Sequence, residues 1–320
     1  MSESSKNDRR DFLRKGALGV TLAACGQLLF SCSNPQGGEE VVETGDTVKM
    51  LTPEGELVEI DKAHLKHVHK TKKTTPQEAR EGFPDKKFVM VIDLARCTNA
   101  RKCVIACQKF HHLPPEQEFL SIKLMQDNPN SAPYWFPKNC YHCDNPPCVK
   151  VCPVDATYKR QDGVVLVDAD RCIGCKFCMT ACPYSTRIFN WSENKELPVD
   201  LDTHHSSPEA SIPAQAGTVA KCDFCPDLVR MGRLPECVAA CPNGAFYFGD
   251  QNEDIVTNGS ETVRFSQLLK DRAGYRYGEE LGTEPRVYYL PPDNRIMPVE
   301  SGFENLPEEI AERYKDVKLK

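Results

Sequence analysis

Fifteen cysteines lie between residues 97 and 241, in four blocks with short and regular spacings. The third block reads Cys172-x2-Cys175-x2-Cys178-x3-Cys182-Pro183. The second reads Cys140-x2-Cys143-x4-Cys148-x3-Cys152-Pro153, and the fourth reads Cys222-x2-Cys225-x11-Cys237-x3-Cys241-Pro242. Such runs are typical of iron–sulfur cluster ligation, because soft thiolates are the ligands that these clusters prefer. The blocks therefore predict several iron–sulfur clusters on one chain.

The first block lacks one ligand. It contains Cys97, Cys103 and Cys107, and Ala100 stands where the second cysteine is expected. The chain itself identifies the gap, because residues 89–97 align without a gap on residues 164–172 and this register places Ala100 on Cys175. An apolar methyl group cannot bind iron, so the sequence predicts one unusual cluster.

The rest of the cysteine-rich region also aligns with itself. Residues 147–153 match residues 236–242, and a short strand-like run follows each of them. Residues 88–158 and 164–247 therefore form two copies of one unit. The predicted fold class is α+β, a duplicated bacterial-ferredoxin-like core of two pseudo-symmetric dicluster units with irregular N- and C-terminal extensions.

The chain divides into four predicted parts. Residues 1–32 are a twin-arginine signal peptide, since Arg9-Arg10 precede Phe12-Leu13 and a modest apolar run. Residues 33–85 form a tether and a small N-terminal extension, residues 86–250 the cluster core, and residues 251–320 a C-terminal extension. The last thirty or so residues are expected to form a loosely ordered tail. The predicted location is the periplasmic side of the cytoplasmic membrane, as a peripheral protein.

Two cysteines lie outside the cluster blocks. Cys25 and Cys32 each follow a short apolar stretch that resembles a lipoprotein processing site, and polar residues follow Cys32. Two interpretations remain open at this stage: a lipid anchor, with Cys32 preferred, or two cysteines of a discarded peptide.

Composition narrows the functional classes. The net charge of −6 disfavours nucleic-acid binding, which depends on basic patches. The chain has no phosphate-binding glycine fingerprint and no nucleophile motif, so neither a catalytic residue nor a small-molecule substrate of its own is expected. A zinc-stapled module is the structural alternative, but runs of three cysteines with a trailing proline fit iron–sulfur clusters better.

Over residues 86–290 the sequence resembles the four-cluster iron–sulfur subunits of DMSO reductase-type molybdopterin oxidoreductases and related membrane quinone complexes. The segments that carry the resemblance include residues 145–154, 170–175 and 279–290. The resemblance implies which cysteines share a cluster. It assigns Cys97, Cys103 and Cys241 to cluster A, Cys222, Cys225, Cys237 and Cys107 to cluster B, Cys140, Cys143, Cys148 and Cys182 to cluster C, and Cys172, Cys175, Cys178 and Cys152 to cluster D.

The resemblance also implies a function and partners. Clusters B, C and D would be [4Fe-4S] clusters, and cluster A would face the catalytic subunit. Because Ala100 leaves cluster A with three thiolates, three outcomes stay open for its site: a [3Fe-4S] cluster, a further ligand such as water, or no cluster. The [3Fe-4S] cluster is preferred, because three thiolates match its three irons. The chain would relay electrons between a catalytic subunit, of the molybdopterin type, and an integral membrane quinone-binding subunit. The alternatives are a subunit of a quinol-oxidising or sulfite-linked membrane complex without a molybdenum partner, and a diffusible periplasmic ferredoxin.

Overall fold

The computed structural model describes residues 47–51, 57–61, 74–192, 205–209, 211–212, 214–295 and 297–317. The predicted signal peptide with Cys25 and Cys32, and most of the tether, lie outside these residues. The N-terminal extension contains a hairpin, with β1 (Thr47–Leu51) antiparallel to β2 (Leu57–Asp61). Within the described ranges, no helix combines the length and the apolar character needed to cross a membrane.

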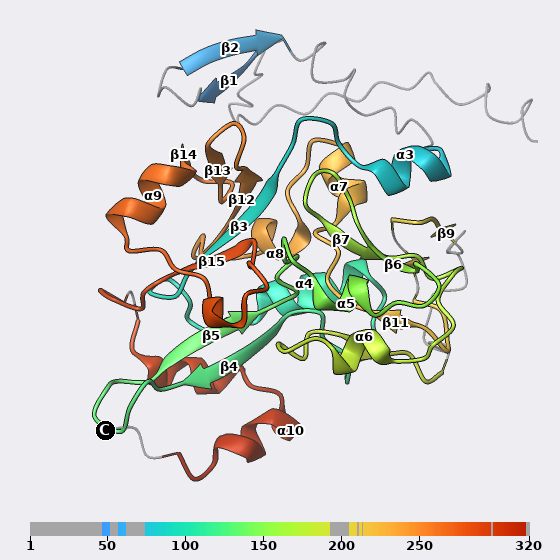
Figure 1. Ribbon diagram of the computed structural model, residues 1–320. Helices are drawn as coiled ribbons and strands as arrows, with labels where there is room; N and C mark the ends of the chain where they lie inside the picture. The colour runs from blue at the N-terminus through green and yellow to red at the C-terminus, as the bar shows by residue number, and fades with distance from the viewer. Residues whose placement is uncertain are drawn as a thin grey trace, which may run out of the picture. The chain divides into compact units, whose positions relative to one another are not determined.

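A five-stranded sheet organises the core, in the order β14-β13-β12-β3-β15 (Figure 1). Its strands are β3 (Phe88–Asp93), β12 (Phe246–Asp250), β13 (Ile255–Thr257), β14 (Thr262–Arg264) and β15 (Val287–Leu290). β3 pairs antiparallel with β12 and parallel with β15. The sheet thus joins the first block, the end of the fourth block and the C-terminal extension, which lie far apart in the sequence.

Strand β3 is buried on both faces because every residue of it is apolar except Asp93. Met90 and Ile92 pack in the main core beside several predicted cysteine ligands, whereas Val89 and Val91 pack against α9 (Phe265–Asp271) residues on the other face. This alternation is the two-residue period of a strand. It places the cysteine-bearing segments on one side of the sheet.

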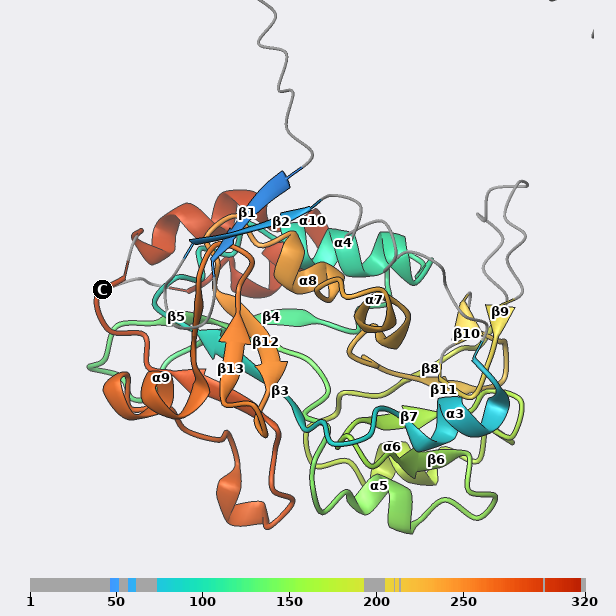
Figure 2. The same ribbon diagram turned by 90° about the horizontal axis from the view of Figure 1, so that it is seen from above.

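Two-stranded pairs and short helices make up the rest of the described core (Figures 1 and 2). The two-stranded pairs are β4 (Ser121–Met125) with β5 (Tyr134–Lys138), β6 (Thr157–Lys159) with β7 (Val165–Val167), β8 (Ile188–Phe189) with β11 (Val219–Ala220), and β9 (His205–Ser206) with β10 (Ser211–Ile212). The short helices are α3 (Pro76–Glu81), α4 (Lys102–Phe110), α5 (Pro147–Lys150), α6 (Phe177–Thr180), α7 (Pro226–Arg230), α8 (Glu236–Ala239) and α10 (Glu308–Ala311). Helices this short are unstable in isolation, so tertiary packing and bound ligands must hold them. The mixed architecture agrees with the predicted α+β class.

The C-terminal segment packs onto the core instead of forming a loose tail. The 3₁₀ segment Val299–Asn305 receives a hydrogen bond from Trp135 Nε1 to the Val299 carbonyl, 3.2 Å long. Asn99 Nδ2 donates a second one, 2.8 Å long, to the Gly302 carbonyl. A Cβ on Gly302 would lie 2.2 Å from Trp135 Nε1, so only glycine allows this approach. The C-terminal extension therefore holds the loop that contains Ala100.

Candidate functional site

All fifteen cysteines of the four blocks are free thiols, and most of them are buried. Burial raises the pKa of the Cys97, Cys143 and Cys222 thiols to about 12, because a thiolate is poorly solvated in the interior. Isolated thiols here would therefore stay protonated at neutral pH. Only a bound metal centre would keep them as thiolates, which is the form that ligates iron.

The four cysteines assigned to cluster C line one cavity. Cys140, Cys143, Cys148 and Cys182 surround it, together with Arg187 and apolar residues. Cys140 and Cys143 follow strand β5, Cys148 lies on α5, and Cys182 follows α6. Three separate elements thus bring together the four residues that the family resemblance placed in one ligand set.

The cysteines assigned to cluster A line a second cavity, and Ala100 is on its wall. Cys97, Cys103 and Cys241 face this cavity together with Ala100. Asn99 and Arg101, on either side of Ala100, have φ values of 54° and 55°, the left-handed region that turns the loop sharply. The Cys241 sulfur accepts a hydrogen bond from the Ala245 amide, 3.3 Å long. The structure therefore places three thiols and one methyl group around the same space.

Helix α4 supplies cysteines to two of the predicted clusters. Cys103 and Cys107 lie one turn apart on α4, and both are buried where α4 packs against α8 (Figure 2). Burial raises the pKa of the Cys107 thiol well above its usual value, and the neighbouring Cys222 and Cys225 raise it further. The pKa of the Cys237 thiol, on α8, is also raised well above its usual value, by burial and then by the neighbouring Cys222, Cys107 and Cys103. Cys107 is thus close to the fourth-block cysteines, as the ligand set for cluster B requires.

The residues assigned to cluster D lie nearest the surface. Cys175 is the exposed member, and Cys172 and Cys152 are partly exposed. Cys178 lies on α6, which contacts α5 just before Cys152. The pKa of Cys152 is lowered, because hydrogen bonds from backbone amides, including that of Thr157, outweigh the effect of burial.

An apolar surface surrounds this exposed loop. Ile173, Phe177 and Trp191 are 64%, 59% and 77% exposed. The Lys176 ammonium lies 3.6 Å from the centre of the Trp191 ring, within the range of a cation–π contact. No pattern in the sequence predicts this arrangement, because Trp191 and Lys176 belong to different elements.

Two aromatic residues connect the cysteine loops of the second and fourth blocks. His142 lies between Cys140 and Cys143, and Phe224 between Cys222 and Cys225. Their rings stack with centroids 3.7 Å apart. His142 is fully buried and its pKa is lowered well below its usual value, chiefly by desolvation, so its ring is neutral. The two rings therefore fill the space between the ligand sets predicted for clusters B and C.

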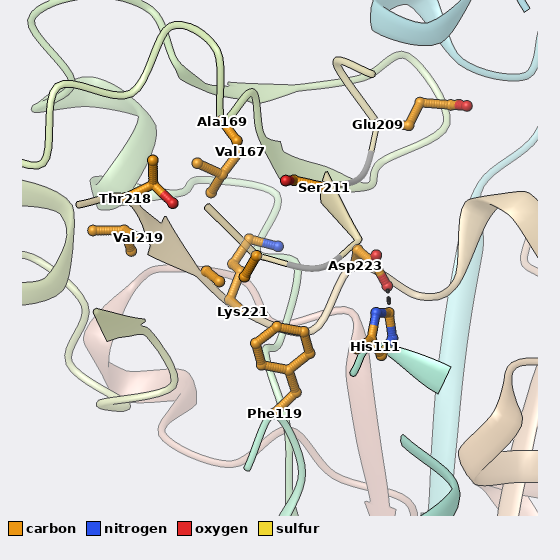
Figure 3. A pocket seen from close by; sticks show the side chains of 12 residues that line it. His111, Phe119, Val167, Ala169, Glu209, Ser211, Thr218, Val219, Lys221 and Asp223 are labelled. Atoms are coloured by element: carbon orange, nitrogen blue, oxygen red, sulfur yellow. Dashed lines mark ion pairs between the residues drawn. The ribbon is translucent and has the colours of Figure 1, made fainter. Parts of the chain in front are cut away.

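Sequence reasoning also missed a histidine beside one of the predicted ligands. His111 Nε2 lies 3.6 Å from Asp223 Oδ1 and 3.7 Å from the Cys225 sulfur. Figure 3 shows His111 and Asp223 facing each other at the edge of a small cavity. Ligand-type atoms of His111, Asp223 and Cys225 lie within 4.8 Å of one another. His111 ends α4 and lies more than a hundred residues from Cys225, so no spacing motif reveals the contact.

These residues fit iron–sulfur clusters. Thiolates are the ligand type that the clusters require, and seven of the cysteines gather around two cavities. Buried polar atoms without a hydrogen-bond partner point to the same conclusion, and Arg187 Nη2 and His142 Nε2 are two such atoms in the wall of the cluster C cavity. When bound, iron–sulfur clusters accept and release single electrons.

Comparison with known proteins agrees with this chemistry. Residues 132–205 and 209–251 match a family model described as a 4Fe-4S dicluster domain. A subunit of the selenate reductase of Mesobacillus selenatarsenatis is 35% identical over 303 residues, which cover 90% of this chain and 98% of that protein. The chain belongs to the family of iron–sulfur subunits of reductase complexes.

Two further relatives are named as subunits of other reductases. A subunit of the tetrathionate reductase of Salmonella typhimurium is 34% identical over 227 residues, covering 69% of this chain and 78% of that protein. The iron–sulfur cluster-binding subunit of the menaquinone reductase of Nitratidesulfovibrio vulgaris is 34% identical over 235 residues, covering 64% of this chain and 88% of that protein. Membership in the family confirms the prediction of an iron–sulfur electron-transfer subunit.

Proposed function

We propose that this chain relays electrons between a catalytic subunit of the molybdopterin type and an integral membrane subunit that reacts with quinone. The observation that carries the proposal is the grouping of seven of the cysteines around two cavities in one core, as the ligand sets of clusters C and A. Relatives named as subunits of selenate, tetrathionate and menaquinone reductases support it. The chain's own residues contribute the positions and the electrostatic surroundings of the clusters, with no bond chemistry of their own.

The ligand sets of this proposal are those given by the resemblance. The cavity shared by Cys140, Cys143, Cys148 and Cys182 supports cluster C, and the cavity shared by Cys97, Cys103 and Cys241 supports cluster A. The proximity of Cys107 to Cys222 and Cys225 supports cluster B. Cluster D, with Cys152, Cys172, Cys175 and Cys178, is supported by the contact between α5 and α6.

Three of the clusters are proposed to be [4Fe-4S] and cluster A to be [3Fe-4S]. Ala100 provides no ligand atom on the wall of the cluster A cavity, and three thiolates match a core of three irons. Since cluster type affects the reduction potential, cluster A would differ in potential from the other clusters.

The proposed core is a duplication of one dicluster ferredoxin unit. Strands β6 and β12 follow the second and fourth blocks at corresponding places. His142 and Phe224, which stack on each other, also occupy corresponding positions in the two cysteine loops, and both have positive φ values. An approximate symmetry between the two halves would explain why these two loops meet.

The proposed location is the periplasmic side of the cytoplasmic membrane. The twin-arginine segment at residues 9–10 supports export of the folded protein, which allows clusters to be assembled before translocation. A lipid on Cys32, or on Cys25, would attach the protein to the membrane as a peripheral subunit. The division into residues 1–32, 33–85, 86–250 and 251–320 belongs to this proposal.

Affinity purification of the natively expressed chain from solubilised membranes tests the relay. We expect a membrane subunit and a catalytic subunit with molybdenum to co-purify. In this complex, a reduced menaquinone analogue or the catalytic subunit's electron donor should reduce the clusters, and EPR detects that reduction. A complex without molybdenum would favour a quinol-oxidising or sulfite-linked assembly. Recovery of the chain alone from the soluble fraction, with no exchange with quinone, would contradict the relay and favour a diffusible ferredoxin.

A further inference from the structure

Four arginines in the described part of the chain are buried, and three of them have carboxylate partners. Arg160 pairs with Asp162 and Glu209. The two others, Arg286 and Arg101, pair with Asp144 and Glu118. Arg187 is the exception, because it is 5% exposed and forms no ion pair with a described carboxylate.

The hydrogen bonds of Arg187 leave its charge unbalanced. Nη1 donates to the Thr157 hydroxyl at 3.2 Å, which is a neutral partner. Nη2 is buried and has no hydrogen-bond partner. Burying a guanidinium without a counter-charge is expensive, so an arginine in this position requires a nearby negative charge, which no described carboxylate supplies.

The position of Arg187 identifies that anion. Its side chain lines the cavity that Cys140, Cys148 and the other cluster C cysteines surround. Burial alone would lower the pKa of Arg187, but the charge interactions with Cys148, Cys178 and Cys140, and a hydrogen bond with Cys148, outweigh burial and raise it. Cys148 belongs to the proposed ligand set of cluster C and Cys178 to that of cluster D. Thr157, which accepts the hydrogen bond from Arg187, donates its amide to the Cys152 sulfur of cluster D at 3.3 Å. Arg187 therefore lies between two ligand sets whose clusters would carry negative charge.

The elements around Arg187 explain how it reaches both sets. It precedes strand β8 and follows the Cys182-Pro183 turn that ends the third block. Thr157 begins β6, directly after the segment that contains Cys152. In both views α5, α6, β6 and β7 gather in one part of the molecule (Figures 1 and 2), and α5 contacts both α6 and β6. The hydrogen bond to Thr157 thus fixes the guanidinium where these segments meet.

We propose that Arg187 is a positioning residue for electron transfer, the buried counter-cation of clusters C and D, and that it raises the reduction potential of both. This inference rests on the proposed ligand sets. Reduction adds one negative charge to a cluster, and a nearby buried cation stabilises the more negative form because the interior screens charge weakly. Arg187 lines the cavity of cluster C and is linked to cluster D only through Thr157, so cluster C should respond most.

Redox titration of the intact, cluster-loaded protein, followed by EPR, tests this role in three variants. Arg187→Gln removes the charge, and Arg187→Lys keeps it. Arg171→Gln is the matched control, because Arg171 precedes the ligand Cys172 but its side chain is 52% exposed and pairs with Asp168. Iron and sulfide are measured in every sample.

In Arg187→Gln the ratio of reduced to oxidised cluster C at a fixed potential should fall by about tenfold or more, a downward shift of about 59 mV for one electron. A smaller downward shift is expected for cluster D, and little or none for Arg187→Lys and Arg171→Gln. Unchanged potentials at full iron content in Arg187→Gln would overturn the proposal.

Loss of clusters gives an equally clear result. If Arg187→Gln loses iron that Arg187→Lys retains, the charge is required to hold the clusters, as proposed. If both variants lose it, the shape of arginine matters and its charge does not, which overturns the proposal. Too little iron for clusters C and D in the unmodified protein would instead refute the ligand sets themselves.

Discussion

The loop around Ala100 depends on Asn99, and replacing Asn99 by alanine should weaken it strongly. Asn99 is 1% exposed, and its amide donates to the buried Gly302 carbonyl at 2.8 Å. The substitution leaves that carbonyl unpaired, which costs about 1–3 kcal/mol. It also places alanine at a φ of 54°, which asparagine tolerates better, for about 1 kcal/mol more. The expected destabilisation is therefore about 2–4 kcal/mol.

The assay is the rate at which guanidinium bleaches the visible absorbance of the anaerobic, cluster-loaded protein. Unfolding with cluster loss is irreversible, so a rate is the appropriate quantity. If the Asn99 contact forms after the folding transition state, the full cost appears in the unfolding rate, which rises roughly 30- to 900-fold.

Asn243→Ala is the matched control. Asn243 also lines the cluster A cavity and donates to the Thr98 hydroxyl at 2.7 Å, but it is only partly buried, so water can replace its partner. Loss of this bond should cost about 0.5–1.5 kcal/mol, which accelerates bleaching only about 2- to 13-fold. Equal rates for the two variants would refute the view that the C-terminal segment anchors this loop through Asn99.

Two further predictions concern the cluster D loop and the C-terminal extension. A Cβ on Gly174 would lie 2.3 Å from the Gly217 carbonyl oxygen, whereas a Cβ on Gly217, at a similar positive φ, meets no atom within 4 Å. Gly174→Ala should therefore lose iron equivalent to about one cluster and Gly217→Ala should retain it; equal iron contents would contradict the clash. The hydrogen bond from Tyr247, helped by Arg96, lowers the pKa of Glu261 below 4.5, so its stabilisation is present above that pH and lost as the pH falls through the folded-state pKa. In Glu261→Gln the rate of bleaching in urea should rise less steeply toward acid pH, by less than about 1 kcal/mol in barrier height because the site is half exposed. The same acid dependence of the rate in both proteins would count against this ion pair.

Local patterns in the sequence predicted local structure well. The Asp162-Gly163 dipeptide predicts a turn, and strands β6 and β7 form the expected hairpin with Gly163 at a φ of 85°. The aromatic and β-branched run at residues 286–290, before Pro291-Pro292, predicts a strand, and the structure has β15 there. The apolar spacing at residues 264–270 predicts a short helix, and the structure has α9 there. These elements depend on turn residues and hydrophobic period, which short windows of sequence contain.

Contacts between distant segments could not be predicted in the same way. Nothing in the sequence indicates that β3 pairs in parallel with β15, nearly two hundred residues later. The position of Arg187 beside Cys148, and of His111 beside Cys225, depends on how separate elements pack, and neither pair has a spacing signature. The C-terminal segment looked polar and loose, yet a few buried contacts, such as that of Trp135 with Val299, hold it on the core.

Low-temperature EPR with iron and sulfide counts, on the anaerobic protein before and after dithionite, tests the four-cluster relay most directly. We predict four clusters and, in the oxidised sample, a near-isotropic three-iron signal that Ala100→Cys abolishes by supplying the missing thiolate. Iron sufficient for only three cubes, with no three-iron signal, would contradict the relay as proposed and show that Cys97, Cys103 and Cys241 hold no cluster.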